Sequence, residues 1–390
     1  MKRVFSLILA VFFILSVTKN VDALSVSAEC ACVIDMSTGR VIYEKNAGMQ
    51  HTMASTTKIM TALIALENSN PDDVVTVSKN AAGKEGTSLY LKAGQKATME
   101  DLLYGLMLQS GNDAAVAIAE GVSGSVEEFA RLMTERANSI GAKNSSFKNP
   151  NGLDEDGHYT TAYDLALITK EAMKNEKFSE IVSTKSKTIL DGTQTVSNHN
   201  KMLRNYDGCI GVKTGFTKKS GRCLVTAAKR GGVGIIAVTL NAPDDWRDHA
   251  NMLDYAFSTT EYFPVILSGM TINTITVKDG TSKTVEVTAT EDFYISENKE
   301  DKFKNITVKC DIPKEVTAPV YQGDKIGELS VYYKDKLQKK IDLVISASVG
   351  VEVKEYDDFW KNFKKIVTYK GPRILNSRRS IPRRIIKELY

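Results

Sequence analysis

The sequence has few of the residues that build disulfide bonds or metal sites. Its 390 residues include five cysteines and four histidines, and neither set has the spacing of a disulfide scaffold or of a metal site. The cysteines are Cys30, Cys32, Cys209, Cys223 and Cys310. A Gly-x-Ser-x-Gly motif, typical of one class of serine hydrolases, is also absent. We therefore expect no metal and no cofactor.

Long apolar segments are scarce as well. One uncharged, largely apolar run covers residues 4–17; it follows Lys2 and Arg3 and leads to Val21-Asp22-Ala23. Because this run is too short for a comfortable membrane span, it predicts a secretory signal peptide over residues 1–23, and hence an exported protein. An uncleaved anchor is the alternative.

The largest excess of one charge lies near the C-terminus. The net charge is +4, but residues 354–390 hold eleven Lys and Arg against four Asp and Glu, so the body of the chain is mildly acidic. On a helical wheel Phe359, Trp360 and Phe363 share one face, and lysines occupy the other. This pattern argues against a nucleic-acid partner and predicts a helix lying on an anionic membrane surface. A helix packed on its own domain is the alternative.

Residues 24–260 combine strand and helix patterns. Two short strands are expected around the turn Ser37-Thr38-Gly39, and the period after Cys209 predicts three adjacent antiparallel strands. Between them, apolar spacing predicts helices from Ser55 and from Thr98, the second of which stops at Ser110-Gly111-Asn112. Strands at both ends with helices between them indicate an α+β fold, an antiparallel sheet backed by a helical cluster.

Capping residues predict where further helices begin and end, and alternating segments predict a second domain. Ser125 and Glu128 form a capping-box pattern for a helix that Gly141 closes, and Thr161 and Asp245 begin two more helices. Over residues 263–353 five alternating segments between turn signals predict a small all-β domain.

One serine stands out among four Ser-x-x-Lys tetrads. These tetrads begin at Ser16, Ser55, Ser145 and Ser296, and only Ser55 opens a helix whose next turns are apolar. Residues three apart on a helix lie on one face, so Lys58 can reach the Ser55 hydroxyl. A lysine removes a serine proton only where burial or another cation lowers its pKa, and the apolar surroundings of Lys58 supply the first condition.

Two other short motifs add groups that this chemistry needs. Lys213-Thr214-Gly215 lies in a predicted strand, where the lysine offers a second cation and the glycine allows close approach of a substrate backbone. Ser110-Gly111-Asn112, at a corner between two helices, offers a hydroxyl and an amide. Each motif is weak by itself.

Taken in order, the three motifs resemble those of the penicillin-recognising serine acyl transferases. Within that group the stretches MASTTKIMTALIALE, LMLQSGNDAAVAIAE and GVKTGFT are most similar to the low-molecular-mass D-alanyl-D-alanine carboxypeptidases of the serine peptidase S11 type. Members of that family also have a β-rich second domain and a terminal amphipathic helix. The resemblance implies a β-lactamase/transpeptidase-like first domain.

The resemblance also implies catalytic roles. Ser55 would attack the carbonyl between the two terminal D-alanines of a peptidoglycan stem peptide and form an acyl-enzyme, with Lys58 as the general base. Ser110 would relay a proton to the leaving amine, and Asn112 would hold the substrate amide. β-Lactam antibiotics would inhibit the enzyme by acylating it.

Further residues would bind the substrate. Lys213 would keep Lys58 neutral and, with Thr214 beside Gly215, bind the terminal carboxylate. The backbone N–H groups of Ser55 and Phe216 would form the oxyanion hole; some relatives have histidine at the Phe216 position. Arg247 matches an arginine that the family places near the carboxylate.

Two residues near these motifs have two interpretations each. His158 is either a structural hydrogen-bonding residue or a catalyst. Cys223, expected across a hairpin from Lys213, either packs in the core or modulates the site through its thiol.

Two alternative functions stay open. A serine β-lactamase would need a deacylating base such as the glutamate of a Glu-x-x-Leu-Asn loop, and no such pentad occurs. A catalytically silent wall-binding protein on the same fold would not require Ser55 and Lys58. The carboxypeptidase interpretation places the protein at the extracytoplasmic face of the cytoplasmic membrane or in the cell wall, with residues 354–390 on the membrane.

Overall fold

The computed structural model describes residues 24–352, 361, 363 and 364, which form two compact units. The first unit comprises residues 24–268, 291–309 and 329–341, and the second comprises the other described residues. The predicted signal peptide and nearly all of the predicted tail helix lie outside the described residues. Within the described ranges, no helix has both the length and the apolar character needed to cross a membrane.

An antiparallel sheet is the centre of the first unit. Its five strands are β1 (Cys30–Asp35), β2 (Val41–Lys45), β7 (Cys209–Thr217), β8 (Gly221–Arg230) and β9 (Val233–Leu240), in the order β2-β1-β9-β8-β7. The pairing of β1 with β9 joins the beginning of the unit to its later strands. The structure therefore confirms that the strands predicted at both ends share one sheet.

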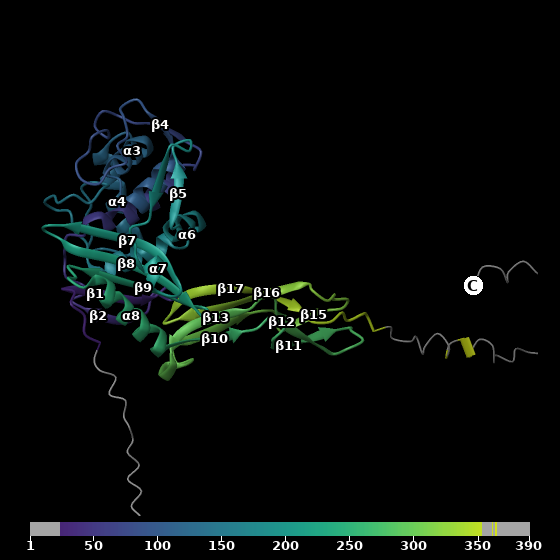
Figure 1. Ribbon diagram of the computed structural model, residues 1–390. Coiled ribbons are helices and arrows are strands. Elements are labelled where there is room, and N and C mark those ends of the chain that lie inside the picture. The colour runs from purple at the N-terminus through teal and green to yellow at the C-terminus, as the bar shows by residue number, and fades with distance from the viewer. Residues whose placement is uncertain (1–23, 353–360, 362, 365–390) are drawn as a thin grey trace, which may run out of the picture. The chain divides into compact units, whose positions relative to one another are not determined.

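Both faces of this sheet are covered, which explains why every residue of β1 is buried. Cys32 and Ile34 pack into the larger core with the helical cluster, whereas Ala31 and Val33 pack into a second core with the last helix. Figure 1 shows that helix, α8 (Asp245–Thr259), on the opposite side of the sheet from α3 (Asn112–Ser123).

The remaining helices and short hairpins complete the first unit. The helices are α1 (Lys58–Asn68), α2 (Met99–Tyr104), α4 (Val126–Ile140), α5 (Ala162–Ala172), α6 (Glu176–Ser183) and α7 (Met202–Asn205). The hairpins pair β3 (Val74–Thr76) with β4 (Lys96–Thr98) and β5 (Ser186–Ile189) with β6 (Gln194–Ser197). The elements that were not predicted are α6, α7 and the four short strands β3 to β6, which are too short for a clear period in the sequence.

The later part of the chain is almost entirely β-structure, as predicted. Strands β10 (Thr260–Ile266) and β13 (Phe293–Asn298) pair with each other. A six-stranded sheet follows the order β14-β16-β17-β12-β11-β15, with β11 (Thr271–Lys278), β12 (Thr284–Ala289), β14 (Ile306–Asp311), β15 (Glu315–Thr317), β16 (Lys325–Tyr333) and β17 (Lys336–Ile345). The five predicted strands are present. Three strands were not predicted. β10 contains Pro264, β13 lies in a charged segment, and β15 has only three residues.

The ends of α4 follow the capping signals. Ser125 Oγ accepts a hydrogen bond of 3.1 Å from Glu128 N, and Gly141 adopts a left-handed φ of 98° at the other end. The Glu128 carboxylate pairs with Arg131.

We expect Ser125→Ala to lower the free energy of unfolding by about 1 kcal/mol, because the N–H of Glu128 loses its acceptor. Ser125→Asp, which keeps an acceptor at the cap, should lose little. Urea unfolding of both variants measures the difference. Equal losses in the two variants would show that Ser125 acts through something other than its hydrogen bond.

Candidate active site

Ser55 lies in a short 3₁₀ turn, Ala54–Thr57, that precedes α1. The predicted helix therefore begins at Lys58 rather than at Ser55. Ala54 has a φ of 48°, in the left-handed region that residues with a side chain seldom occupy. This turn raises Ser55, which is partly exposed, above the buried beginning of α1.

Lys58 Nζ is surrounded by three oxygen atoms. It lies 2.9 Å from Ser55 Oγ, 2.8 Å from Asn112 Oδ1 and 2.6 Å from the backbone oxygen of Asn151. The side chain of Lys58 is fully buried. The amide of Asn112 has a fixed orientation, because its Nδ2 donates to the backbone oxygen of Glu85 at 2.6 Å.

This arrangement selects a direction of proton transfer. The oxygens of Asn112 and Asn151 accept hydrogen bonds but cannot donate them. A neutral lysine amine has two N–H groups and one lone pair, so both hydrogens are committed to these acceptors. The lone pair is left facing Ser55 Oγ, whose hydrogen it can accept.

The electrostatic environment favours the neutral amine. Burial, and then the nearby positive charge of Lys213, hold the pKa of Lys58 well below its usual value, although the carboxylate of Asp113 opposes the shift. Burial also lowers the pKa of Lys213 to about 7. Lys213 Nζ donates to the backbone oxygen of Thr214 at 2.9 Å.

The Ser110 corner lies beside this group. α2 continues into a π-helical turn, Gly105–Gln109, which ends at Ser110 with a left-handed φ of 67°. Asn112 is already the first residue of α3. The corner thus places the Ser110 hydroxyl at the cavity and directs the Asn112 amide towards Lys58.

Two glycines allow backbone segments to approach the Ser55 turn. A Cβ on Gly215 would lie 3.0 Å from Ser55 N, so strand β7 runs directly beside the turn. A Cβ on Gly152 would lie 1.9 Å from the Ala54 oxygen. Gly215 was expected to admit a substrate backbone, but the segment closest to it is the enzyme's own nucleophile turn.

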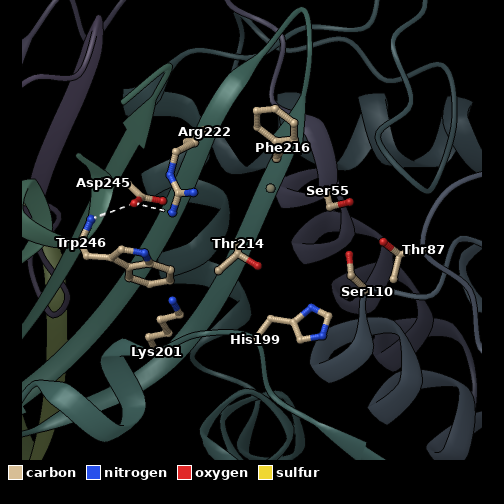
Figure 2. A pocket seen from close by; sticks show the side chains of 11 residues that line it. Ser55, Thr87, Ser110, His199, Lys201, Thr214, Phe216, Arg222, Asp245 and Trp246 are labelled. Carbon is tan, nitrogen blue, oxygen red and sulfur yellow. Dashed lines mark hydrogen bonds and ion pairs between the residues drawn. The ribbon is translucent and has the colours of Figure 1, made fainter. Parts of the chain in front are cut away.

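A cavity of about 380 Å³ opens above Ser55. It is lined by Ser55, Thr87, Ser110, His199, Lys201, Thr214, Gly215, Phe216, Arg222, Asp245 and Trp246. Figure 2 shows the hydroxyl groups of Ser55, Thr87 and Ser110 on one side of it and Arg222, Trp246 and Lys201 on the other. Five of the predicted residues thus line one cavity, while Lys58, Asn112 and Lys213 are buried in the adjoining protein.

Arg247 does not belong to this group. Its side chain is 76% exposed, it forms an ion pair of 3.2 Å with Asp244, and it is not among the residues that line the cavity. Arg222 lies at the cavity instead, paired with Asp245 at 2.8 Å and facing the ring of Trp246. The β7–β8 register pairs Arg222 with Phe216, so both side chains point to the same face.

The remaining cavity residues were not found from the sequence. Thr87 follows a loop glycine, His199 and Lys201 precede the short helix α7, and Asp245 with Trp246 begins α8. Arg222 lies in a predicted strand, but the expected register, with Cys223 across from Lys213, placed Phe216 opposite Ser220 and not opposite Arg222.

His158 and Cys223 have structural surroundings. His158 Nδ1 accepts a hydrogen bond from the Lys148 N–H at 3.0 Å, so its Nε2–H donates to Thr57 Oγ1 at 2.9 Å, and burial lowers its pKa to about 4. Cys223 lies across from Gly215, not from Lys213 as expected, and burial raises its pKa to about 12. Both residues are buried, which favours the structural interpretation of each.

Comparison with known proteins identifies two matching families. Residues 17–244 match the D-alanyl-D-alanine carboxypeptidase family, and residues 261–351 match the C-terminal domain of penicillin-binding protein 5. The chain is 36% identical over 322 residues to D-alanyl-D-alanine carboxypeptidase DacF of Bacillus subtilis, covering 80% of this chain and 83% of the relative. It is 30% identical over 341 residues to DacD of Escherichia coli, covering 82% and 86%.

Solved structures agree with these matches. A peptidoglycan synthesis regulatory factor (PBP3) from Streptococcus pneumoniae is similar with a TM-score of 0.70 and 26% identity, over 83% of this chain and 100% of that one. Penicillin-binding protein 5 from Haemophilus influenzae is similar with a TM-score of 0.62 and 26% identity, over 84% and 98%. The chain therefore belongs to the D-alanyl-D-alanine carboxypeptidases, the penicillin-binding serine peptidases whose motifs its sequence carries in order.

Proposed function

We propose that Ser55 is the nucleophile of the carboxypeptidase reaction and that Lys58 is its general base. One observation carries this assignment. Lys58 Nζ has two partners that can only accept hydrogen bonds, Asn112 Oδ1 and the Asn151 oxygen, and its third partner is Ser55 Oγ. A buried neutral amine held in this way removes the serine proton as the hydroxyl attacks.

The reaction would proceed through an acyl-enzyme. Ser55 Oγ bonds to the carbonyl carbon of the penultimate D-alanine of a stem peptide while its proton passes to Lys58 Nζ. The C–N bond then breaks, and the leaving D-alanine amine receives a proton from Lys58 through the Ser110 hydroxyl. Water attacks the ester carbonyl, gives a proton to Lys58, and Ser55 recovers it as the product leaves.

The oxyanion hole would consist of the backbone N–H groups of Ser55 and Phe216. The close approach of Gly215 to Ser55 N supports this pairing, because it brings both segments to one side of the attacked carbonyl. Each such donor contributes about 3–4 kcal/mol to stabilisation of the transition state in other enzymes.

The substrate carboxylate would bind at the cationic side of the cavity. Lys213 and the hydroxyl of Thr214 are the predicted contacts, and Arg222 takes the place that the sequence suggested for Arg247. The ion pair with Asp245 holds the Arg222 guanidinium at the cavity. Asn112 would fix Lys58 through its oxygen and would offer its second N–H to the substrate amide.

The proposal includes the location of the protein. The family acts on peptidoglycan stem peptides and binds β-lactams. We assign residues 1–23 to a signal peptide, 24–260 to the catalytic domain, 263–353 to the β-rich domain and 354–390 to a basic segment on the anionic membrane surface. The apolar run after Lys2 and Arg3 and the charge of the tail support an exported enzyme at the extracytoplasmic face.

Lys58→Ala should lower the rate of D-alanine release from diacetyl-Lys-D-Ala-D-Ala by about 10²–10⁴-fold, the usual contribution of a general base. Ser55→Ala should abolish release, since no acyl-enzyme can form. Lys174→Ala, at an exposed lysine, is the control and should have no effect. If wild type releases no D-alanine but hydrolyses penicillin rapidly, the protein is a β-lactamase. If wild type and all three variants lack both activities, the protein is a binding protein.

Lys213→Met should shift the acidic limb of the pH profile of acylation to higher pH. The acidic limb is the range in which the acylation rate falls as the pH is lowered. Lys58 acts as a base in its neutral form, so activity is lost as the pH falls through its lowered pKa. Removal of the Lys213 charge raises that pKa, because one cause of its depression is gone. Acylation by saturating fluorescent penicillin, followed against pH, measures the limb. Lys213→Arg keeps the charge and should leave the limb near its wild-type position; identical limbs in all three proteins would refute the coupling.

Arg222→Ala should raise KM for a D-Ala-D-Ala peptide by about tenfold or more, the effect of losing one charge-assisted hydrogen bond. Arg247→Ala is the matched control and should change KM little, since that side chain points to solvent. With a peptide whose terminal carboxylate is replaced by an amide, the two variants should behave alike. A KM effect of Arg247→Ala larger than that of Arg222→Ala would restore the assignment made from the sequence.

A further inference from the structure

Tyr90 is displayed in an unusual way. The residue is 84% exposed, although both neighbours, Leu89 and Leu91, are buried. Its φ of 61° lies in the left-handed region, where an aromatic residue with a Cβ is disfavoured. A backbone that turns a large ring outward at this cost is typical of a functional position.

The loop that carries Tyr90 is held rigidly from below. The buried carboxylate of Asp113 accepts hydrogen bonds of 3.0 Å from the N–H groups of Leu89 and Leu91 and one of 2.7 Å from Ser88 Oγ. Ser88 Oγ in turn accepts the N–H of Tyr90 at 2.9 Å. The ring is therefore presented on a fixed platform that is anchored next to Asn112 of the catalytic group.

A groove of about 660 Å³ runs beside the ring. Its lining combines the loop with the β5–β6 hairpin: Leu89, Tyr90, Leu91, Lys92, Gln95, Leu190, Thr193 and Gln194. A flat aromatic face rimmed by amide, hydroxyl and ammonium groups matches an N-acetylated sugar. The C–H face of a pyranose ring packs on an aromatic ring, while its hydroxyl and acetamido groups hydrogen-bond to such a rim.

The loop that carries Tyr90 lies on the side of the cavity where the glycan end of a bound stem peptide is expected. If the D-alanine carboxylate binds beside Arg222 and Thr214, the rest of the stem leaves the cavity on the side where Figure 2 places Thr87. Thr87 and Tyr90 are three residues apart, so their Cα atoms are separated by at most about 11 Å. The four stem residues between the scissile bond and the glycan span about 13–14 Å when extended.

We propose that Tyr90 and the groove beside it bind a sugar ring of the glycan strand that carries the stem peptide. This site rests on the proposed function of the cavity, because the stem peptide connects the two. It makes the enzyme more efficient on glycan-linked stems than on free peptides, since the sugar contributes binding that a free peptide lacks.

The test compares two substrates that differ only in the sugar. The full-length protein and its Tyr90→Ala and Tyr90→Phe variants are assayed with a free pentapeptide and with the same pentapeptide linked to its disaccharide. We expect Tyr90→Ala to lower kcat/KM for the disaccharide pentapeptide by about five- to tenfold, mainly through KM, and to leave the free pentapeptide unaffected. Tyr90→Phe retains the ring and should resemble wild type on both.

The outcomes separate the two proposals. Equal kcat/KM of wild type and Tyr90→Ala on the linked substrate overturns the sugar site, and so does an equal loss on both substrates, which means that the change disturbs the loop. Absence of D-alanine release from the free pentapeptide by wild type would instead count against the proposed function. A stem-free glycan fragment added to the linked assay should inhibit wild type more strongly than Tyr90→Ala.

Discussion

The amine of Lys58 lies within 2.6–2.9 Å of three oxygen atoms in the protein interior, and the rest of the site is arranged to keep it there uncharged. A buried ammonium without a carboxylate partner is costly, so the neutral form is favoured and a lone pair becomes available. The second buried lysine, Lys213, reinforces this choice. In a protein that does not use a neutral lysine as a base, two buried lysines this close together would only lower the stability of the fold.

Backbone geometry, more than side-chain chemistry, brings the three motifs to this amine. Ala54 and Ser110 both adopt left-handed φ angles, and each such residue costs on the order of 1–3 kcal/mol. Gly152 and Gly215 remove the Cβ atoms that would keep the neighbouring segments from the nucleophile turn. The sheet and the helical cluster supply the packing that maintains these strained positions, since the core around α1 and α3 is fully buried.

The two sides of the cavity also differ in their chemistry. Cationic and aromatic groups from β8, α8 and the segment before α7 line one side, and hydroxyl groups from the helical cluster line the other. A substrate with a carboxylate at one end and a long peptide at the other fits such a cavity in one orientation. Asp113 stabilises the hydroxyl side, because its carboxylate holds the loop that includes Ser88 and follows Thr87.

The sequence by itself determined the order of the motifs, the α+β pattern and the family. Ser55 and Lys58 are three residues apart, and the caps at Ser125 and Gly141 act within one turn, so local spacing is sufficient to predict them. Only the tertiary structure decided that Arg222, not Arg247, lies at the cavity, and that Asn151 accepts a hydrogen bond from Lys58. These relations join segments far apart in the chain. They depend on strand register and on which face of a helix is buried, and neither is encoded in the spacing of neighbouring residues.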